Sequence, residues 1–387
     1  MKDNNCFCFV PNWWESHQIE ESISPHFLYW PCEMMLEKGF NVEIVTKLDA
    51  WQYFGRNVPT DEIYKGIRIK RIPHSLFGLF FSKYMIKKRY KLIHGWSYAY
   101  FGERNVWAVS KIKKIPYVFT PQGRWHNNPT NIMEQSIRKL YDCIMSFCDR
   151  KTDAIMCLTD YEASQYRERG YTNVVTIPHG IDPKIFNVKP NYEVYEKYNM
   201  FDYNNILSVG ALFPRKNQHL LIDCLPNVLK EFPNTKLFIV GKAYRPEDQK
   251  YELYLKSKVQ KLNLKNNVSF LGYIPKSDLI NLYLLSDIFV LPTQFEAFGI
   301  VFLEAMAAGL PIITTNKQPM KEILDYGRVG KLVNLSTKDL SSSIICLLSD
   351  FNERRRLAKL GKLHVEKKYR LDLVKEKLWR LYQEVIG

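Results

Sequence analysis

The fold is most clearly indicated by the stretch Gln294-Phe295-Glu296-Ala297-Phe298-Gly299-Ile300-Val301-Phe302-Leu303-Glu304-Ala305-Met306-Ala307-Ala308-Gly309-Leu310-Pro311. It follows the apolar run Ile288-Phe289-Val290-Leu291-Pro292, which is typical of a buried parallel strand. The stretch itself predicts a helix that Gly309 and Pro311 end. A strand therefore leads directly to the N-terminus of a helix.

This helix N-terminus is suited to an anionic group such as a diphosphate. The amides of residues 298–301 have no helical partners, the helix dipole lies behind them, and Gly299 lets a ligand approach the backbone. Glu296 and Glu304 flank that position, roughly 12 Å apart at the rise of a helix. Carboxylates accept hydrogen bonds well from vicinal hydroxyls. A nucleotide-linked sugar would satisfy both acids; the simpler interpretation is a helix with two surface acids.

Paired cations follow another strand-like segment, residues 206–209. Gly210 begins a tight turn that ends in Arg215 and Lys216 and leads into a helix. Such a turn lies at the carboxyl edge of a sheet, where doubly wound folds bind ligands. Two cations there would neutralise a diphosphate leaving group, although paired basic residues at a helix start are often only solvated charge.

Strand-like and helix-like segments alternate along both halves of the chain, which predicts two doubly wound α/β domains. In the first half the strands are expected at residues 6–10, 42–46, 91–94, 117–120, 154–158 and 174–177, with a helix near 26–38. In the second half they are expected at 206–209, 236–240, 268–272, 288–291 and 312–315, with helices at 218–231, 251–261 and 276–285. The strand pattern lapses at residues 182–200, where we place the boundary.

The net charge of +15 is concentrated in residues 65–114, which hold many cations and the single acid Glu103. Within this basic segment, the aromatic run 76–81 is followed by Lys83, Lys87, Lys88 and Arg89. Interleaved aromatic and basic residues suit an anionic membrane surface. Nucleic acid is the competing partner, and a solvated helix face is the alternative without a partner.

Cysteine usage and hydropathy indicate a cytoplasmic protein. The eight cysteines are dispersed and show no metal-binding spacing, so we expect reduced thiols. No apolar run has the length needed to span a bilayer, and the N-terminus lacks a signal-peptide pattern. Peripheral attachment at the inner face of the cell membrane is expected from the basic segment.

Motifs spread over residues 177–333 resemble glycosyltransferase family 4 (glycosyl transferases group 1). The resemblance rests on the segments 177–182, 208–210, 238–241, 268–272, 296–304 and 327–333. It implies two facing Rossmann-like doubly wound domains (GT-B type) with an interdomain cleft, and retaining transfer from a nucleotide-diphosphate sugar. It also implies an N-terminal acceptor domain over residues 1–185, a nucleotide-sugar donor domain over 186–370, and a C-terminal helix, 371–387, that packs back on the first domain.

The resemblance assigns roles to the matching positions of the donor domain. Lys216 and Arg215 would bind the donor diphosphate, Glu296 the hydroxyls of the transferred sugar, and Glu304 the nucleotide ribose. Glu296, Lys216 and Arg215 are the expected catalytic residues. The expected donor-binding residues are Gly210, Phe298, Gly299, Ile300 and Glu304.

Four further residues are candidates for the cleft. Gln122 stands where family members often carry a histidine, so an acid-base role is not expected there. Trp13 would stack on an acceptor sugar or serve as a packing residue. His94 and His179 are candidate cleft residues, although histidines at such positions are more often structural.

No metal or other cofactor is expected, because the nucleotide sugar is the co-substrate and no metal-ligand set is evident. The expected acceptor is a glycan or a lipid-linked molecule, as in synthesis of a cell envelope glycan. A sugar-nucleotide epimerase or a phosphorolytic enzyme of the same fold is the nearest alternative function. A nucleic-acid-binding scaffold is the alternative from another class, but no nucleic-acid motif is recognisable, so none is expected as a partner.

Overall fold

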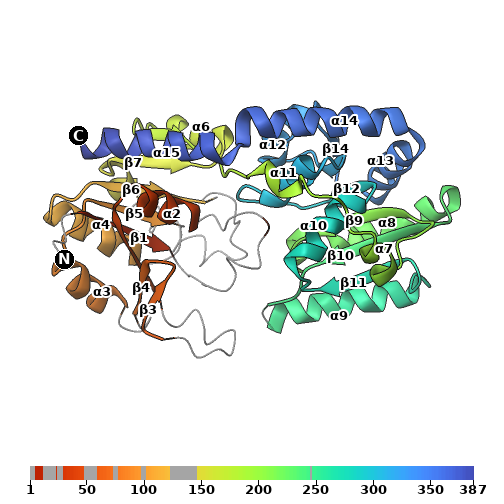
Figure 1. The fold of residues 1–387 in the computed structure, drawn as a ribbon, viewed down its shortest axis with the longest axis horizontal. Coiled ribbons are helices and arrows are strands. Elements are labelled where there is room, and N and C mark those ends of the chain that lie inside the picture. The colour runs from red at the N-terminus through yellow and green to blue at the C-terminus, as the bar shows by residue number, and fades with distance from the viewer. Residues whose placement is uncertain are drawn as a thin grey trace. The chain divides into compact units, whose positions relative to one another are not determined.

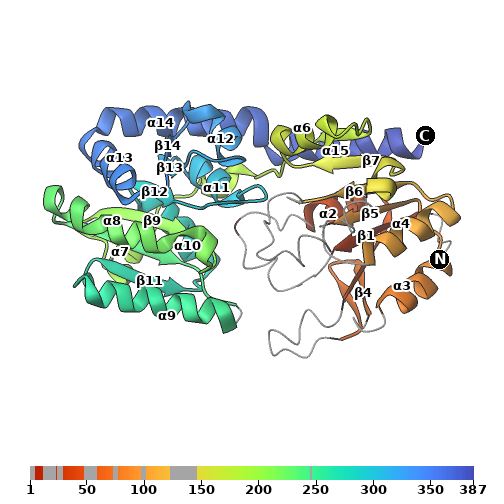
Figure 2. The ribbon, with the colours of Figure 1, turned by 180° about the vertical axis from the view of Figure 1, so that it is seen from behind.

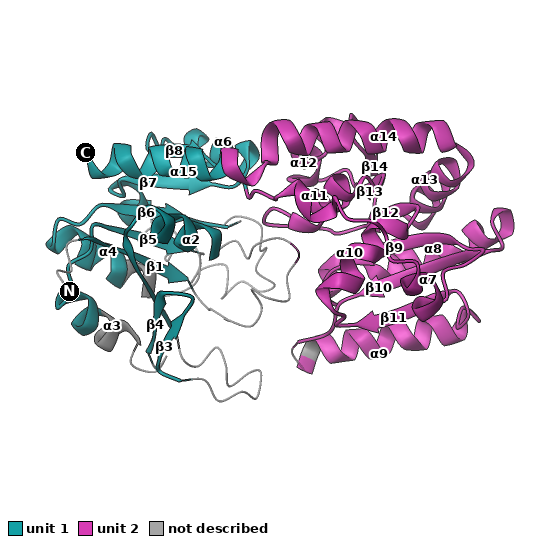
Figure 3. Ribbon diagram, viewed as in Figure 1, with its two compact units in different colours: residues 1–20, 25–178, 374–387 teal, residues 21–24, 179–373 magenta. Residues whose placement is uncertain are grey.

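The computed structural model describes residues 5–11, 23, 29–47, 59–72, 77–96, 102–122, 146–244 and 246–387. The chain divides into two compact units, each with its own mainly parallel sheet (Figures 1 and 3). The first unit comprises Met1–Glu20, Pro25–Pro178 and Val374–Gly387, and the second comprises Glu21–Ser24 and His179–Leu373. The chain therefore leaves the first unit after Pro178 and returns to it at Val374.

The first unit contains an eight-stranded sheet in the order β3-β4-β2-β1-β5-β6-β7-β8. Neighbouring strands pair in parallel, except for the antiparallel hairpin of β3 and β4. The strand order reverses between β1 and β5, as in other doubly wound folds. The strands are β1 (Cys6–Pro11), β2 (Asn41–Lys47), β3 (Asp61–Tyr64), β4 (Ile67–Ile72), β5 (Leu92–Trp96), β6 (Tyr117–Thr120), β7 (Ala154–Cys157) and β8 (Val174–Thr176).

Helices pack on both faces of this sheet. Successive residues of β1 point to opposite faces, and their contacts show which helices lie on each face. Cys8 joins the apolar cluster that includes Met85 of α3 (Phe77–Ile86) and Val106 of α4 (Gly102–Ile112). Phe7 instead contacts Tyr382 of α15 (Leu371–Ile386), with 5.6 Å between ring centroids. The remaining helices of this unit are α2 (Tyr29–Glu37) and α6 (Asp160–Glu168).

The second unit contains a six-stranded, fully parallel sheet in the order β11-β10-β9-β12-β13-β14. The order reverses between β9 and β12, so the loops that leave these two strands diverge at the carboxyl edge and form the usual ligand site of such a sheet. The strands are β9 (Asn204–Val209), β10 (Thr235–Val240), β11 (Val268–Gly272), β12 (Ile288–Leu291), β13 (Ile312–Thr315) and β14 (Lys331–Val333).

Two layers of helices cover this second sheet. An apolar cluster on one face takes residues from α8, α9 and α13, while Phe289 of β12 contacts Tyr283 of α10 and Phe302 of α11 on the other face. In both views α9 lies beside the edge strand β11 (Figures 1 and 2). The helices are α7 (Glu193–Tyr198), α8 (Gln218–Glu231), α9 (Pro246–Lys261), α10 (Lys276–Leu285), α11 (Ile300–Ala308), α12 (Met320–Ile323), α13 (Thr337–Ser349) and α14 (Phe351–His364). Short helical turns lie at Pro183–Phe186, Pro214–Lys216, Asp325–Gly327 and Val365–Tyr369.

The predicted pair of doubly wound α/β domains is confirmed. Strands β6, β11, β12 and β13 and helices α8 and α10 have the predicted bounds. The helix expected at residues 26–38 spans Tyr29–Glu37. Within the stretch 371–387, α15 spans Leu371–Ile386, and its residues from Val374 onward belong to the first unit. None of the helices in the described part of the chain combines the length and the apolar character needed to cross a bilayer.

The hairpin of β3 and β4 was not predicted. Its second strand carries three of the cations of residues 65–114, namely Arg68, Lys70 and Arg71, between apolar residues that are buried. Arg71 is itself buried and pairs with Glu62 at 2.7 Å. Part of the basic segment therefore belongs to a strand rather than to a helix face.

Candidate functional site

The loop that follows β9 carries the two paired cations of the second unit. Phe213 is extended, Pro214 begins a single helical turn at Pro214–Lys216, and Asn217 ends that turn with φ +53°. Proline suits the first position of such a turn, and asparagine tolerates the left-handed backbone better than most residues. The loop thus places Arg215 and Lys216 immediately before α8.

The loop that follows β12 is bound directly to this turn. The side-chain amide of Asn217 donates to the carbonyl oxygen of Pro292 at 3.0 Å, and the amide of Gln294 donates to the carbonyl oxygen of Arg215 at 2.7 Å. The hydroxyl of Thr293 donates to the carbonyl oxygen of Phe295 at 3.0 Å. Backbone and side-chain bonds therefore fix the two loops against each other where the strand order reverses.

Glu296 meets both cations at this junction. The ammonium of Lys216 donates a hydrogen bond to the carboxylate of Glu296, and both side chains are buried. Nη1 of Arg215 lies 3.4 Å from the other carboxylate oxygen and donates to the carbonyl oxygen of Phe295 at 2.7 Å. The three residues that we expected to be catalytic therefore form one cluster in the second unit.

The cluster has one positive charge in excess. Burial lowers the pKa of Lys216, and Glu296 opposes that effect. Burial works against ionisation of Glu296 as well, but the cations of Lys216 and Arg215 outweigh it and hold the pKa of this carboxyl below its usual range. An ionised acid is thus available for hydroxyl groups, and Arg215, whose side chain is 43% exposed, is accessible to an anion from solvent.

Two glycines let the backbone pack closely around Lys216. A Cβ on Gly210 would lie 3.6 Å from Nζ of Lys216, which is ordinary van der Waals distance, and the φ of +157° there is one that residues with a side chain rarely adopt. A Cβ on Gly241, at the end of β10, would lie only 2.2 Å from the carbonyl oxygen of Gly210. A side chain at position 241 would therefore displace the turn that carries the cations.

Helix α11 starts beside Glu296, and Gly299 makes that start possible. Gly299 has φ +92°, and a Cβ there would lie 2.7 Å from the ring of Phe302 and 3.4 Å from Cγ of Glu296. The first backbone bond at this end runs from the amide of Phe302 to the carbonyl oxygen of Gly299 at 3.0 Å. The amides that precede Phe302, including that of Ile300, lie at the positive end of the helix.

Glu304 lies one turn into α11 and is buried. The hydroxyl of Tyr283, from α10, donates to its carboxylate at 2.9 Å. Burial raises the pKa of Tyr283 far above its ordinary value, and the negative charge of Glu304 adds to this, so the hydroxyl stays protonated as a donor. A tyrosine of the neighbouring helix therefore positions the second acid.

Phe298 and His179 pack together behind the start of α11. The ring of Phe298 is buried and contacts His179 edge-on, with 5.2 Å between centroids, and also contacts Tyr369 at 5.9 Å. His179 is 4% exposed. The side chain of Phe298 thus supports the loop, which leaves its backbone amide as the group suited to a ligand.

The candidate residues of the first unit lie apart from this cluster in the chain and differ from one another. Gln122 follows β6 and has φ +51°. His94 is fully buried: Nδ1 lies 2.6 Å from the hydroxyl of Tyr382, and Nε2 lies 2.9 Å from that of Thr120, so it offers no atom to a cleft. Trp13 lies outside the described residues.

Three residues of the site were not predicted from the sequence. Asn217 and Thr293 connect the two loops through the carbonyl oxygens of Pro292 and Arg215, and Tyr283 binds Glu304. Asn217 is recognisable in hindsight, because an asparagine after a proline-led turn is typical of a left-handed position. Tyr283 gives no such signal, since its role depends on how α10 packs against α11. Among the described residues no cluster of three or more His, Cys, Asp or Glu side chains is arranged to hold a metal ion.

Two family models match the chain, one in each half. The model described as Glycosyl transferases group 1 matches residues 196–364, which contain the whole cluster around Glu296 and Glu304. The model described as Glycosyltransferase Family 4 matches residues 32–185.

Two relatives match larger parts of the chain than either model. The spore coat protein SA of Bacillus subtilis is 26% identical over 255 residues, which are 61% of this chain and 66% of that protein. An uncharacterized glycosyltransferase of Methanocaldococcus jannaschii is 25% identical over 377 residues, 91% of this chain and 92% of that protein. The chain thus matches slightly less than two thirds of the first relative and nearly the whole of the second.

A solved structure shares the fold over almost the entire chain. It is the Anabaena protein HepE in complex with UDP-glucose, with a TM-score of 0.74 and 17% identity over 98% of this chain and 99% of that one. Together with the two family models, which meet near the division between the units, this likeness shows the GT-B type of fold. The chain belongs to glycosyltransferase family 4, the glycosyl transferases of group 1.

Proposed function

We propose that this protein transfers a sugar from a nucleotide-diphosphate sugar to a glycan or lipid-linked acceptor, with retention of the anomeric configuration. The observation that carries the proposal is the buried Lys216–Glu296 pair, placed where the strand order of the second sheet reverses and next to the start of α11. Sites for nucleotide ligands lie at such reversals. The UDP-glucose bound to the structurally similar HepE supports the class of donor.

Each group of the cluster has a role in this proposal. Lys216 and Arg215 bind the diphosphate, and the amides at the start of α11 bind its remaining oxygens. Glu296 accepts hydrogen bonds from hydroxyls of the transferred sugar, and these replace part of its interaction with Lys216. Glu304, held by Tyr283, accepts from the ribose hydroxyls.

The chemistry requires stabilisation of charge more than transfer of protons. As the bond to the anomeric carbon breaks, the diphosphate gains negative charge and the sugar becomes cationic. Cations and amides that are already in place stabilise the first change without rearrangement during the reaction. The ionised carboxylate of Glu296 holds the sugar beside them. We propose that no metal ion takes part and that attack occurs on the face that the nucleotide leaves.

The acceptor belongs to the first unit in this proposal. Lys83, Lys87 and Arg89 are exposed in and after α3, as expected of a surface that meets anionic lipid. Flotation with vesicles that contain phosphatidylglycerol tests this part, with the Lys83→Gln/Lys87→Gln variant as the comparison. Equal flotation of both proteins would remove the membrane from the proposal.

The central experiment screens nucleotide sugars by thermal shift and then measures release of nucleotide diphosphate with candidate acceptors. Release that requires an acceptor identifies a transferase, whereas interconversion of the sugar without release would identify the alternative epimerase. NMR of the product's anomeric centre tests retention, and an assay with EDTA tests independence from metal.

Variants of the cluster test whether these residues carry the activity. Lys216→Ala and Glu296→Gln are expected to lose at least about a hundredfold in kcat, as expected when a preorganised charged contact is removed. The matched controls are Lys338→Ala and Glu231→Gln, because both side chains are exposed in the same unit. Near-normal turnover in a folded cluster variant would refute the assignment.

A further inference from the structure

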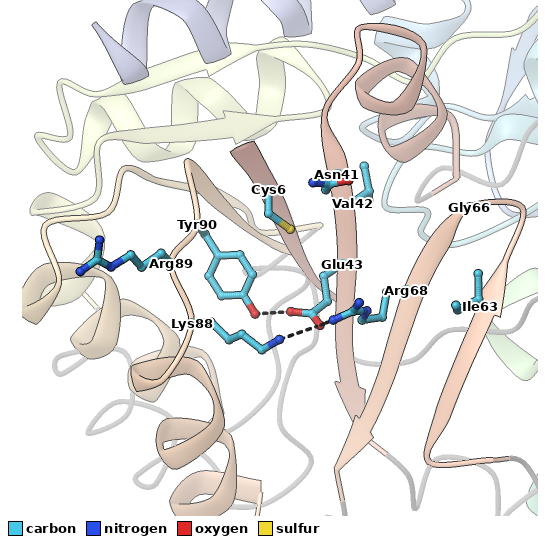
Figure 4. Close-up of a pocket in the computed structure, with 10 residues that line it drawn as sticks. All are labelled: Cys6, Asn41, Val42, Glu43, Ile63, Gly66, Arg68, Lys88, Arg89 and Tyr90. Atoms are coloured by element: carbon cyan, nitrogen blue, oxygen red, sulfur yellow. Dashed lines mark hydrogen bonds and ion pairs between the residues drawn. The ribbon is translucent and has the colours of Figure 1, made fainter. Parts of the chain in front are cut away.

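A cavity of about 170 Å³ lies at the amino ends of β1 and β2, at the edge opposite to the carboxyl ends of these strands (Figure 4). Its wall includes Cys6 of β1, Glu43 of β2 and Arg68 of β4, together with Lys88 and Tyr90 of the segment between α3 and β5. Ligands of doubly wound sheets bind at the carboxyl edge, so this cavity is not part of the usual site.

Glu43 is a buried acid at the centre of this wall. It is 3% exposed, and both of its oxygens accept hydrogen bonds from tyrosine hydroxyls, from Tyr84 at 2.7 Å and from Tyr90 at a shorter distance. Burial raises the pKa of both tyrosines, and their interactions with Glu43 add to this, so both hydroxyls remain donors. Neutral donors, rather than cations, therefore hold the carboxylate of Glu43.

Two cations approach Glu43 from either side of the cavity, as Figure 4 shows. Nη1 of Arg68 lies 4.0 Å and Nζ of Lys88 lies 3.8 Å from the same carboxylate oxygen. Both distances exceed that of a hydrogen bond. Within the described part of the chain neither cation donates a hydrogen bond, so their N–H groups are available to an anion that enters the cavity. The two cations exceed the single acid by one positive charge.

The cavity wall is held in place on both sides. The ammonium of Lys113, which directly follows α4, donates to the carbonyl oxygens of Ile86 and Lys88, and the amide of Lys91 donates to the carbonyl oxygen of Cys6 at 2.8 Å. On the other side, Arg68 pairs in register with Glu43 across β2 and β4. A site whose backbone is already fixed binds a small ligand without the entropic cost of ordering a loop.

We propose that this cavity binds a phosphate monoester between Arg68 and Lys88. The planar guanidinium presents two N–H groups to a phosphate, and the ammonium neutralises a second charge. The volume is sufficient for a phosphate with a small organic group. The same chemistry occurs in soluble sugar or glycerol phosphates and in the headgroup of phosphatidic acid. This site is independent of the donor site and of its proposed reaction.

The test uses the local thiol as a reporter. Cys6 lines the cavity and is partly exposed, while Cys346 is exposed on α13 in the second unit. Alkylation of both by iodoacetamide is followed by peptide mass spectrometry with and without inorganic phosphate or glycerol 3-phosphate. At ten times the Kd, the ligand is expected to slow modification of Cys6 about tenfold and to leave Cys346 unchanged. The Lys216→Ala protein must show the same protection, because Lys216 does not line this cavity.

Three variants complete the test, after thermal unfolding has shown that each is folded. Arg68→Gln/Lys88→Gln is expected to raise the Kd by about tenfold or more, since charge-assisted hydrogen bonds are lost. The control Lys83→Gln/Lys87→Gln removes the same charge from exposed neighbours outside the cavity and is expected to leave the Kd unchanged. Glu43→Gln retains the shape and removes the opposing charge, so it is expected to tighten binding.

The source of the phosphate is settled by comparison of vesicles. Protection by glycerol 3-phosphate, but not by vesicles with phosphatidic acid, identifies a soluble ligand. Protection by vesicles with phosphatidic acid, but not by vesicles of equal charge with phosphatidylglycerol, identifies a lipid headgroup. Equal protection by both lipids, protection that persists in Arg68→Gln/Lys88→Gln, or no protection by any probe would overturn the proposal.

Discussion

The side-chain amide of Asn217 donates a hydrogen bond to the carbonyl oxygen of Pro292 and so connects two loops that are 75 residues apart in the chain. One loop carries Arg215 and Lys216, and the other carries Glu296. The relative position of the cations and the acid therefore depends on this bond as well as on the sheet.

Replacement of Asn217 by glycine is expected to lower activity more than stability. Glycine accepts the left-handed backbone of this position, so the free energy of unfolding falls only by about 1 kcal/mol, the value of the lost hydrogen bond. The misplaced loop lowers kcat/KM for the donor. Denaturant unfolding and donor kinetics measure the two effects. Asn217→Ala is expected to lower the free energy of unfolding by about 1 kcal/mol more than Asn217→Gly, because alanine strains the left-handed backbone. Unchanged donor kinetics in Asn217→Gly would contradict the role of the hydrogen bond.

Tyr283→Phe is expected to weaken donor binding through Glu304. Glu304 loses one of its hydrogen bonds inside the protein, which costs about 1–3 kcal/mol in folding and leaves the acid less firmly positioned. The KM for the donor should rise more than kcat falls, since the ribose lies away from the reacting bond. Tyr195→Phe serves as the control, because that hydroxyl donates to the carbonyl oxygen of Leu285 and not to an acid of the site. Equal kinetics in the two variants would argue against a positioning role for Tyr283.

Gly299→Ala should be far more harmful than Gly272→Ala. Both glycines have positive φ, so both substitutions strain the backbone, but a Cβ at position 272 meets no atom within 4 Å. At position 299 it would lie 2.7 Å from the ring of Phe302 at the start of α11. The difference in thermal stability between the two variants measures the effect of the clash with Phe302. A loss of donor binding in Gly299→Ala but not in Gly272→Ala would show that the clash affects the site. Similar behaviour of the two proteins would show that the close approach is unimportant.

His94 should make the protein less stable in mild acid. Burial lowers the pKa of His94 well below its ordinary value of 6.5, so the unfolded chain binds a proton at a pH where the folded protein does not. The contribution of His94 is therefore fully present above pH 6.5 and is lost as the pH falls toward the folded-state pKa, by up to about 1.4 kcal/mol per pH unit. The free energy of unfolding is measured between pH 5 and pH 8 for the wild type and for His94→Gln. The contribution of His94 is the difference between the slopes of the two plots of free energy against pH. Parallel curves would be incompatible with a neutral, buried His94.

The second unit was largely predictable because its strands are continuous apolar runs bounded by glycine or proline. Such runs are typical of parallel strands covered on both faces, and β12 and β13 have the predicted bounds for that reason. The sequence predicted that the turn with Lys216 lies at the carboxyl edge of the sheet. Its approach to Glu296 depends on the strand order, because both residues follow strands at the reversal point. Roles within the cluster came from the family resemblance and stay predictions.

The first unit was less predictable for a physical reason. In β4 the residues Arg68 and Lys70 alternate with isoleucines, and Arg71 breaks that alternation because it is buried against Glu62. The cations at these positions were interpreted as part of a basic surface or helix face, whereas the backbone there forms a strand. The cavity beside Glu43 was equally inaccessible from sequence, because its walls come from segments that only the sheet brings together.

The return of the chain to the first unit at Val374 has a consequence for its synthesis. The ribosome makes β1 and β5 early, but α15, which covers Phe7 and binds His94 through Tyr382, only after the entire second unit. The second unit can complete its core during translation, whereas the part of one apolar face of the first sheet that α15 covers stays exposed until that helix emerges. The nascent chain therefore presents this face to chaperones, or to other copies of itself, for longer than its position near the N-terminus suggests.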